Sequence, residues 1–257
     1  MRAQTPTRER LMEHLRDEIL AGRLAPGAKL PPERALAHEF RLSRPIVREV
    51  LSGLQEHGLV DILPARGTYV RAPSAADGAR SLESHLRRRN ATAREVMDAR
   101  LMLETHAARL AAVHATATDL AALEQCVADT DAAKSVVERA RGDIAFHGLL
   151  ARASHNTVIE TMFASITGLA FELMLRSQAD PDVARRGMPY HRRVLDAVRA
   201  GEPDAAEASM RKHLELAASL YGSDYDRSVE SVAQRVLGPG VSLDGLLDEV
   251  ARRAEAT

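Results

Sequence analysis

Residues 42–51 read LSRPIVREVL, and this stretch decides how the N-terminal part of the chain folds. Ser43 is a natural N-cap, because its hydroxyl can accept a hydrogen bond from a backbone N–H in the first turn of a helix. The apolar side chains that follow recur at the three- and four-residue spacing of one helical face. They are Val47, Val50, Leu51 and Leu54. The stretch therefore predicts an amphipathic helix that begins after Ser43 and buries one side.

Two shorter helices are expected before this helix, and a β-hairpin is expected after it. Apolar residues recur at helical spacing between residues 11 and 20, and Pro32 suits the first turn of a second helix. The β-prone runs 59–63 and 68–70 flank a Pro-Ala-Arg-Gly turn. Three helices followed by a small β wing predict a winged helix-turn-helix domain over residues 1–71.

The charge of the chain is divided unevenly along its length. The formal net charge is −1 at pH 7, but residues 1–71 carry eleven arginines and Lys29 against nine acidic residues, a surplus of +3. The remaining residues carry a net charge of −4. A basic N-terminal segment favours a polyanionic partner at that end of the chain.

The composition excludes several classes of protein. Aromatic residues make up 3% of the 257 residues and tryptophan is absent, which favours helices over a β-sandwich or barrel. The single cysteine, Cys126, excludes an intramolecular disulfide and a cysteine-rich zinc site. No apolar run reaches the roughly 18 residues of a membrane span, and the charged N-terminus lacks a signal-peptide core. We therefore expect a soluble, cytoplasmic, mainly α-helical protein with no membrane partner.

A second domain, an antiparallel all-α bundle, is expected after a linker. The linker is assigned to residues 72–91, which begin with the turn-prone stretch APSAADGAR. Thr92 and Glu95 match a capping box that starts a long helix, so the bundle is assigned to residues 92–221. Its helices are expected at residues 92–114, 118–132, 136–153, 157–178, 182–200 and 204–221, with a seventh left open by residues 76–90. Residues 222–257 are assigned to a C-terminal extension with one amphipathic helix near residues 241–253.

The N-terminal motifs resemble those of a known family. Residues 22–37, 42–51, 58–60 and 66–70 are, in sequence and spacing, similar to the GntR family of bacterial transcription regulators. The resemblance implies a homodimer that binds palindromic, double-stranded operator DNA. By similarity to the FadR subfamily, the expected DNA contacts are Arg34, Ser43, Arg44, Ile46, Arg48 and Gly67.

The chemistry of these residues agrees with the resemblance. Arg44 and Arg48 are four residues apart, so they share one helical face and can reach a major groove together. An arginine that binds guanine O6 and N7 contributes roughly 1–3 kcal/mol of base discrimination. Arg66, beside Gly67 at the tip of the wing, would reach the flanking backbone or minor groove. The alternative is that these arginines only solvate an exposed face.

Two residues depart from the family pattern. Arg41 stands in the turn before the third helix, where glycine is usual, so this turn is expected to be looser or to place Arg41 against a phosphate. Pro32 replaces the usual serine cap of the second helix, which is expected to weaken that cap.

The C-terminal domain contains a set of residues with metal-ligand chemistry. Asp143 and His147 are four residues apart and therefore project from one face of a helix. His191 and His213 lie ten and twelve residues from Gly201, so antiparallel packing would bring them to a similar height. One carboxylate and three imidazoles suit zinc, nickel, iron or manganese, of which we favour zinc. For each histidine taken alone, the alternative is an ordinary core or surface residue.

This arrangement resembles the FCD ligand-binding domain of FadR-type GntR regulators. The resemblance covers residues 92–221 and implies that Asp143, His147, His191 and His213 bind a divalent metal ion. It also implies that Arg100 faces an effector pocket, where its guanidinium would bind a small carboxylate. The alternative for Arg100 is a surface ion pair with Glu104. Asn156 is expected either to line the pocket or to cap the helix that begins at Thr157.

These features together predict a ligand-responsive transcription regulator rather than an enzyme. Effector binding would reposition the DNA-binding domains, and release of operator DNA, as in a repressor, is the commoner behaviour implied by the family, with activation left open. The alternative is a metal-dependent hydrolase that uses the Asp/His₃ set to activate water. No general-base or nucleophile motif accompanies these residues, so no catalytic residue is assigned.

Overall fold

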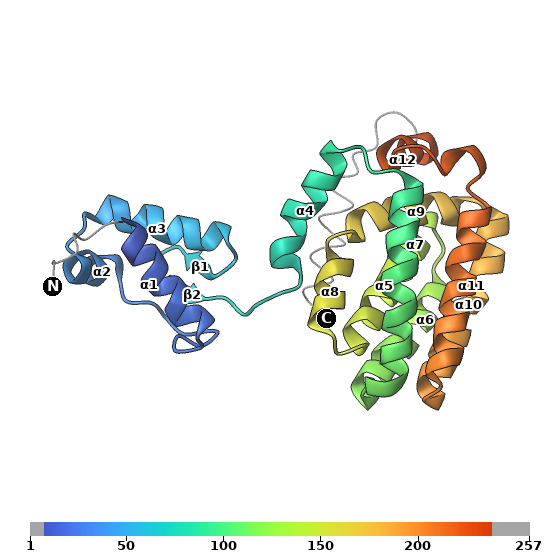
Figure 1. The fold of residues 1–257 in the computed structure, drawn as a ribbon, viewed down its shortest axis with the longest axis horizontal. Helices are drawn as coiled ribbons and strands as arrows, with labels where there is room; N and C mark the ends of the chain where they lie inside the picture. The colour runs from blue at the N-terminus through green and yellow to red at the C-terminus, as the bar shows by residue number, and fades with distance from the viewer. Residues whose placement is uncertain (1–7, 238–257) are drawn as a thin grey trace. The chain divides into compact units, whose positions relative to one another are not determined.

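The computed structural model describes residues 8–237. The chain divides into two compact units, residues 1–78 and residues 79–257, which are considered separately. Both units consist mainly of helices (Figure 1). The predicted fold class, a winged helix-turn-helix followed by an all-α bundle, is confirmed.

The first unit has three helices and one hairpin. Strands β1 and β2 pair antiparallel, with Val60 opposite Val70 and Leu63 opposite Gly67. Its core gathers the apolar face of the third helix, including Val47 and Leu54, each 0% exposed, against the first helix and the hairpin. The elements are α1 (Arg8–Leu20), α2 (Glu33–Phe40), α3 (Arg44–Glu56), β1 (Val60–Leu63) and β2 (Gly67–Val70).

The turn between α2 and α3 explains why glycine is usual at position 41. Arg41 lies in the left-handed region, with φ 52° and ψ 41°, and ends α2. A side chain there costs roughly 1–2 kcal/mol relative to a right-handed conformation. At the start of the same helix, Pro32 is the N-cap and makes no side-chain capping bond, as expected.

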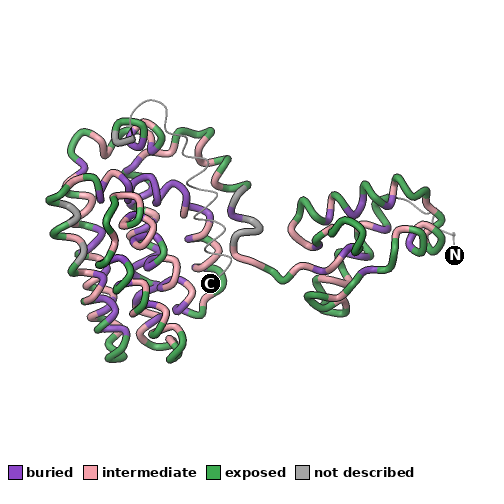
Figure 2. The backbone as a smooth tube through the Cα atoms, turned by 180° about the vertical axis from the view of Figure 1, so that it is seen from behind, coloured by how far each residue is buried: buried purple, intermediate pink, exposed green. Residues whose placement is uncertain are grey.

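The second unit is a bundle built around the long helix α5. α5 packs against α7, α10 and α11, while α6 covers α7 and α12 covers α9. Figure 2 shows the buried stretches concentrated on the inward sides of these helices. The helices are α4 (Ala76–Arg88), α5 (Ala93–His114), α6 (Ala117–Ala132), α7 (Val136–Ala153), α8 (Thr157–Ala164), α9 (Thr167–Ala179), α10 (Pro181–Ala200), α11 (Pro203–Ser219) and α12 (Val229–Leu237).

The prediction of a single helix at residues 157–178 is wrong, because the structure has two helices there, α8 and α9. The two helices are bent by 62°. At the break, the Ser165 hydroxyl donates to the Met162 carbonyl oxygen at 2.6 Å, a local side-chain bond that competes with helix continuation. Among the described helices none is by itself long and apolar enough to cross a membrane, and only the bent pair α8 and α9 passes such a test together.

The segments at both ends of the bundle are more ordered than expected. Residues 76–88, assigned from sequence to the linker, form helix α4, whose Arg87 donates to Glu172 of α9 at 2.5 Å. The extension that begins at residue 222 carries α12, whose Val229 and Val232 are each 1% exposed within the main core. These residues therefore complete the bundle. The helix expected near residues 241–253 lies outside the described residues.

Candidate functional site

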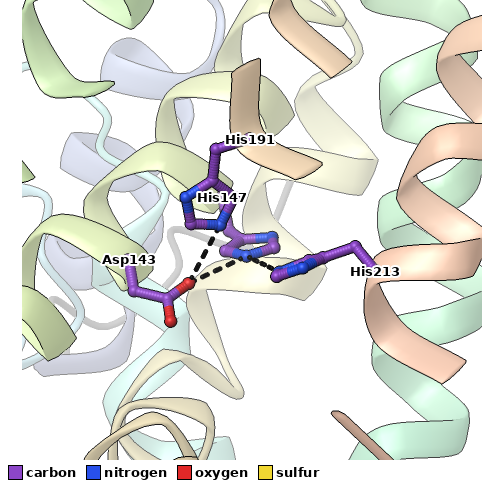
Figure 3. A group of neighbouring side chains, drawn as sticks. All are labelled: Asp143, His147, His191 and His213. Atoms are coloured by element: carbon purple, nitrogen blue, oxygen red, sulfur yellow. Dashed lines mark hydrogen bonds and ion pairs between the residues drawn. The ribbon is translucent and has the colours of Figure 1, made fainter. Parts of the chain in front are cut away.

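Four buried side chains from three helices converge inside the second unit (Figure 3). Asp143 and His147 stand one turn apart on α7, and His191 and His213 come from α10 and α11. Asp143 Oδ1 lies 3.2 Å from Nε2 of His147 and 3.2 Å from Nε2 of His191. His147 Nε2 lies 3.3 Å from His213 Nε2, and one ligand atom from each residue falls within 4.8 Å of the others. The structure thus brings together all four residues singled out from sequence.

The geometry of this cluster fits a metal ion. Asp143 Oδ1 and His191 Nε2 are buried and, despite their proximity, lack a hydrogen bond of acceptable alignment among the described residues. Buried polar atoms that crowd together without aligned hydrogen bonds are stabilised by a shared cation. Zinc–nitrogen bonds of about 2.0–2.1 Å place tetrahedral ligand atoms about 3.3 Å apart, close to the distances found here. The donor set of three imidazoles and one carboxylate suits zinc, nickel, iron and manganese.

The electrostatics favour the ligand-competent form of two members of the cluster, Asp143 and His213. Burial alone would raise the pKa of the Asp143 carboxyl, but the imidazoles of His147 and His191 outweigh it and hold this pKa well below its usual value. Burial and the neighbouring His191 and His147 rings hold the pKa of His213 well below the usual value for histidine. Asp143 is therefore a carboxylate and His213 a neutral imidazole near neutral pH, which are the forms that bind a metal. Burial alone would lower the pKa of His147, but Glu104 and Asp143 outweigh it and raise this pKa, so a metal ion would displace a proton from this ring.

The sequence did not indicate the role of Glu104, because its spacing from Arg100 predicts only a surface ion pair. Arg100 Nε donates to Glu104 Oε1 at 2.6 Å, and the two side chains are 4% and 2% exposed, so this pair is buried. Glu104 Oε2 also contacts Nδ1 of His147. Arg100 and His147 overcome the effect of burial and lower the pKa of Glu104 to about 2. The four-residue spacing signalled the pair, but only the packing of α5 on α7 shows that it is buried beside His147.

A second residue missed from sequence holds the other oxygen of the cluster's carboxylate. Gln178 of α9 donates from Nε2 to Asp143 Oδ2 at 2.8 Å. This bond fixes the carboxylate so that Oδ1 faces the histidines. A lone glutamine at the end of a helix gives no signal of this kind in the sequence.

A small cavity adjoins the cluster. Its volume is about 20 Å³, room for roughly one water-sized group. Its polar lining comes from Arg100, Asp143, Gln178, His191 and His213, with Ser177 beside them. Arg100 therefore both belongs to a buried ion pair and reaches the cavity beside the candidate ligands.

Asn156 is separate from this cavity. Its Oδ1 accepts hydrogen bonds from the backbone N–H groups of Val158 and Ile159 at 3.1 and 3.2 Å, so it is the N-cap of α8. Among the described residues it lines a different surface groove, with Leu110 and His114. The structure therefore favours the capping alternative for Asn156 over a place in the effector pocket.

The predicted DNA-contacting residues lie on the surface of the first unit. Arg34, Arg44, Arg48 and Arg66 are exposed, and Ile46 is partly exposed. Arg48 Nε lies 2.9 Å from both carboxylate oxygens of Glu33, and Arg44 lies 3.5 Å from one of them. Glu33 thus draws the two guanidinium groups of α3 together on one exposed face.

The helix start and the wing tip have specific backbone features. Ser43 is the N-cap of α3 in position, but its hydroxyl makes no capping hydrogen bond. Gly67 has φ +112°, a conformation that L side chains rarely adopt, so the tip of the wing favours glycine. The Ser43 hydroxyl and the exposed Arg66 beside Gly67 are both available to an external partner.

Comparisons with known proteins agree with both units. Residues 7–70 match the model of "Bacterial regulatory proteins, gntR family", and residues 95–216 match that of the FCD domain. The HTH-type transcriptional regulator LutR of Bacillus subtilis (strain 168) is 29% identical over 82% of this chain and 100% of its own. The Uxu operon transcriptional regulator of Escherichia coli (strain K12) is 30% identical over 83% of this chain and 85% of its own. A solved structure, Streptococcus agalactiae GntR, matches with a TM-score of 0.63 and 25% identity, covering 82% of this chain and 98% of that one.

Proposed function

Because this chain belongs to the GntR family of bacterial transcription regulators and carries an FCD domain, we propose that it binds a palindromic operator as a homodimer and is controlled by a small carboxylate bound at a metal ion. The observation that carries this proposal is the buried Asp143–His147–His191–His213 cluster with Arg100 beside it. When bound, a divalent metal supplies a Lewis acid that coordinates an anionic oxygen.

The effector is argued from the charges around the cavity. Arg100 presents a guanidinium to the cavity, and a guanidinium and a metal cation together favour a small anion that has a carboxylate group. The cavity has room for roughly one water-sized group. We therefore propose that the lining helices α9, α10 and α11 move to admit a larger acid. A ligand that binds only the rearranged bundle shifts the population toward it, which is what a switch needs.

The effector would act by changing the affinity for DNA. In the first unit, the exposed Arg44 and Arg48 would read base edges in a major groove. The other proposed contacts, of which Arg34 and the wing tip would reach the flanking backbone or minor groove, are Arg34, Ser43, Ile46, Arg66 and Gly67. We favour release of the operator on effector binding, and thus a repressor. A protein that binds operator DNA works in the compartment that holds the chromosome, so we place it in the cytoplasm.

A homodimer follows from the two-fold symmetry of a palindromic site. Helices α5 and α8 contact one another and carry large apolar side chains in solvent, with Met102 67% and Met162 50% exposed. Val113 and Val158 are exposed on the same two helices. Because an isologous contact buries the same patch of both copies, these exposed apolar side chains suit a second copy of this chain. Met162→Glu is expected to shift the protein toward monomer in sedimentation velocity.

The hydrolase alternative uses the same four side chains to activate water. The curated relatives described above are named transcription regulators, which favours the regulator. The basic first unit is explained by the regulator and has no part in the hydrolase.

Two measurements test the proposal. Fluorescence anisotropy with DNA from upstream of the protein's own gene should show tight binding by the wild type and its loss in the double variant Arg44→Ala, Arg48→Ala. Metal analysis of the purified protein should show a divalent ion that is lost in His147→Ala and in His191→Ala. Unchanged DNA binding in the double variant would refute the assignment of Arg44 and Arg48 to the DNA-binding surface. Full metal retention in the histidine variants would refute the proposed metal site.

A further inference from the structure

We propose that Glu104 is a positioning residue that holds the ligand His147 with one carboxylate oxygen and the cavity residue Arg100 with the other. The inference rests on the proposed metal site, and it adds a coupling between metal binding and anion recognition. Glu104 itself lies on α5, which contributes none of the four candidate ligands.

The contacts place Glu104 between two functional groups. Its Oε1 accepts from Arg100 Nε at 2.6 Å, and its Oε2 lies 3.4 Å from Arg100 Nη2 and contacts His147 Nδ1. The other nitrogen of the same ring, Nε2, faces Asp143 Oδ1 at 3.2 Å and His213 Nε2 at 3.3 Å. His147 therefore meets Glu104 on one side and the candidate ligands on the other.

This arrangement selects which nitrogen of His147 can bind a metal. A carboxylate beside Nδ1 favours the tautomer that carries its proton there, so the lone pair of Nε2 is directed into the cluster. Nδ1 of His147 contacts the Glu104 carboxylate, although neither it nor Nδ1 of His213 is in an aligned hydrogen bond among the described residues. Glu104 thus gives His147 a fixed ring orientation and a more basic Nε2.

The same carboxylate fixes Arg100. Nε and Nη2 of the guanidinium face Glu104, while Nη1 has only the Met97 sulfur, at 3.7 Å, as a hydrogen-bond partner among the described residues. Arg100 also lines the cavity, so an anion that binds there pulls on the guanidinium that Glu104 holds. Since Glu104 also holds His147, anion binding and metal binding are thermodynamically linked, and each changes the affinity of the other by the same factor.

The variant Glu104→Gln separates this role from packing. A carboxylate offers two acceptor oxygens to its two donor partners, Arg100 and His147, whereas an amide offers one acceptor and one NH2. One of the two contacts must therefore be lost. Glu172→Gln is the matched control, because Glu172 is also fully buried and paired with an arginine, Arg87, but touches none of the candidate ligands.

The experiment titrates full-length, metal-free protein with Zn²⁺ in competition with a chromophoric chelator. Co²⁺ loading then reports the ligand geometry through its d–d absorption spectrum. Loss of a residue that orients a metal-bound histidine typically weakens metal affinity about 10–100-fold, which is the result expected for Glu104→Gln, together with a changed Co²⁺ spectrum. Glu172→Gln should match the wild type in both measurements.

The possible results distinguish a failure of the proposed role of Glu104 from a failure of the proposed metal site. Wild-type affinity and an unchanged Co²⁺ spectrum in Glu104→Gln would overturn the role of Glu104 while the metal site stands. Failure of the wild type to bind Zn²⁺ or Co²⁺ would overturn both. Should Glu104→Gln not fold, the Zn²⁺-loaded wild type decides by ¹⁵N and ¹H NMR of the imidazoles. We expect His147 to bind through Nε2 with a strongly downfield Nδ1 proton, and coordination through Nδ1 would refute the inference.

Discussion

The two units each contain an arginine–glutamate pair, and the two pairs are built for opposite purposes. Arg48 and Glu33, in the first unit, lie 2.9 Å apart with side chains 62% and 29% exposed. Arg100 and Glu104, in the second unit, lie 2.6 Å apart with side chains 4% and 2% exposed. The chemistry and the distance are nearly the same, and the burial differs.

Burial decides whether a partner can be exchanged. An exposed ion pair contributes about 0–1 kcal/mol and is screened by salt, so a phosphate or a guanine can replace Glu33 at little cost. A buried charge that loses its partner is left uncompensated, so Arg100 and Glu104 hold one geometry. The first unit thus keeps its guanidinium groups available to an external partner, and the second uses one to fix an internal site.

The largest effect is expected from breaking the buried pair. Arg100→Met leaves the Glu104 carboxylate buried without its guanidinium, and we expect a loss of about 3–5 kcal/mol in the free energy of unfolding. Urea denaturation of the metal-free protein measures it. Arg48→Met, which breaks the exposed pair, should lose less than about 1 kcal/mol. Equal losses in the two variants would refute the contrast between the pairs.

The next effect is on DNA binding. Arg48→Ala should weaken operator binding by about 1–3 kcal/mol, roughly 5–150-fold, because a base contact is removed. The stability of the Arg48→Ala variant should stay unchanged. Fluorescence anisotropy at moderate salt measures the affinity, with Arg211→Ala as the control, since Arg211 forms a similar exposed pair with Glu207 in the other unit. A comparable loss in Arg211→Ala would place the DNA-binding surface elsewhere.

A smaller effect separates the two interpretations of Asn156. Asn156→Ala removes the N-cap of α8 and should destabilise the protein by about 1 kcal/mol. Zn²⁺ affinity should be unchanged, because Asn156 lies outside the described cavity of the cluster. Thermal unfolding and chelator competition measure the two quantities. Weaker Zn²⁺ binding at unchanged stability would instead support the alternative that Asn156 lines the effector pocket.

The smallest effect comes from removing the exchangeable partner. Glu33→Gln takes away the carboxylate that competes with DNA for Arg44 and Arg48, so operator affinity should rise by less than about 1 kcal/mol. Anisotropy titrations at two salt concentrations detect the change. A decrease would show instead that Glu33 is needed to orient the two guanidinium groups.

Local sequence patterns predicted correctly the features that depend on interactions between residues close together in the chain. The apolar stripe Val47–Leu54 predicted the buried side of α3, and Thr92 with Glu95 forms the capping box that begins α5. The i,i+4 spacing of Asp143 and His147 placed them on one face of α7. His191 and His213 lie nearly the same number of residues from the break at Gly201. This spacing predicted that they lie side by side, because two antiparallel helices rise by the same length per residue.

The same patterns did not predict features that depend on contacts between residues distant in the sequence. The hydrophobic periodicity of residues 157–178 did not reveal the bend, which follows from the Ser165 side chain and from burial of Ile166 in the core. The sequence of the extension that begins at residue 222 did not indicate that Val229 and Val232 pack in the core against α9. Such packing depends on surfaces that exist only once the bundle has formed.

The sequence by itself determined the division into two domains, the capping box of α5 and the residues whose chemistry suits DNA and metal binding, because these depend on residue type and short-range spacing. Only the tertiary structure decided the environment of each charge. It buried Arg100 and Glu104 by packing α5 against α7, and it left Arg48 and Glu33 in solvent. The strength of an electrostatic interaction depends on the surrounding dielectric, and spacing along a chain does not specify that dielectric.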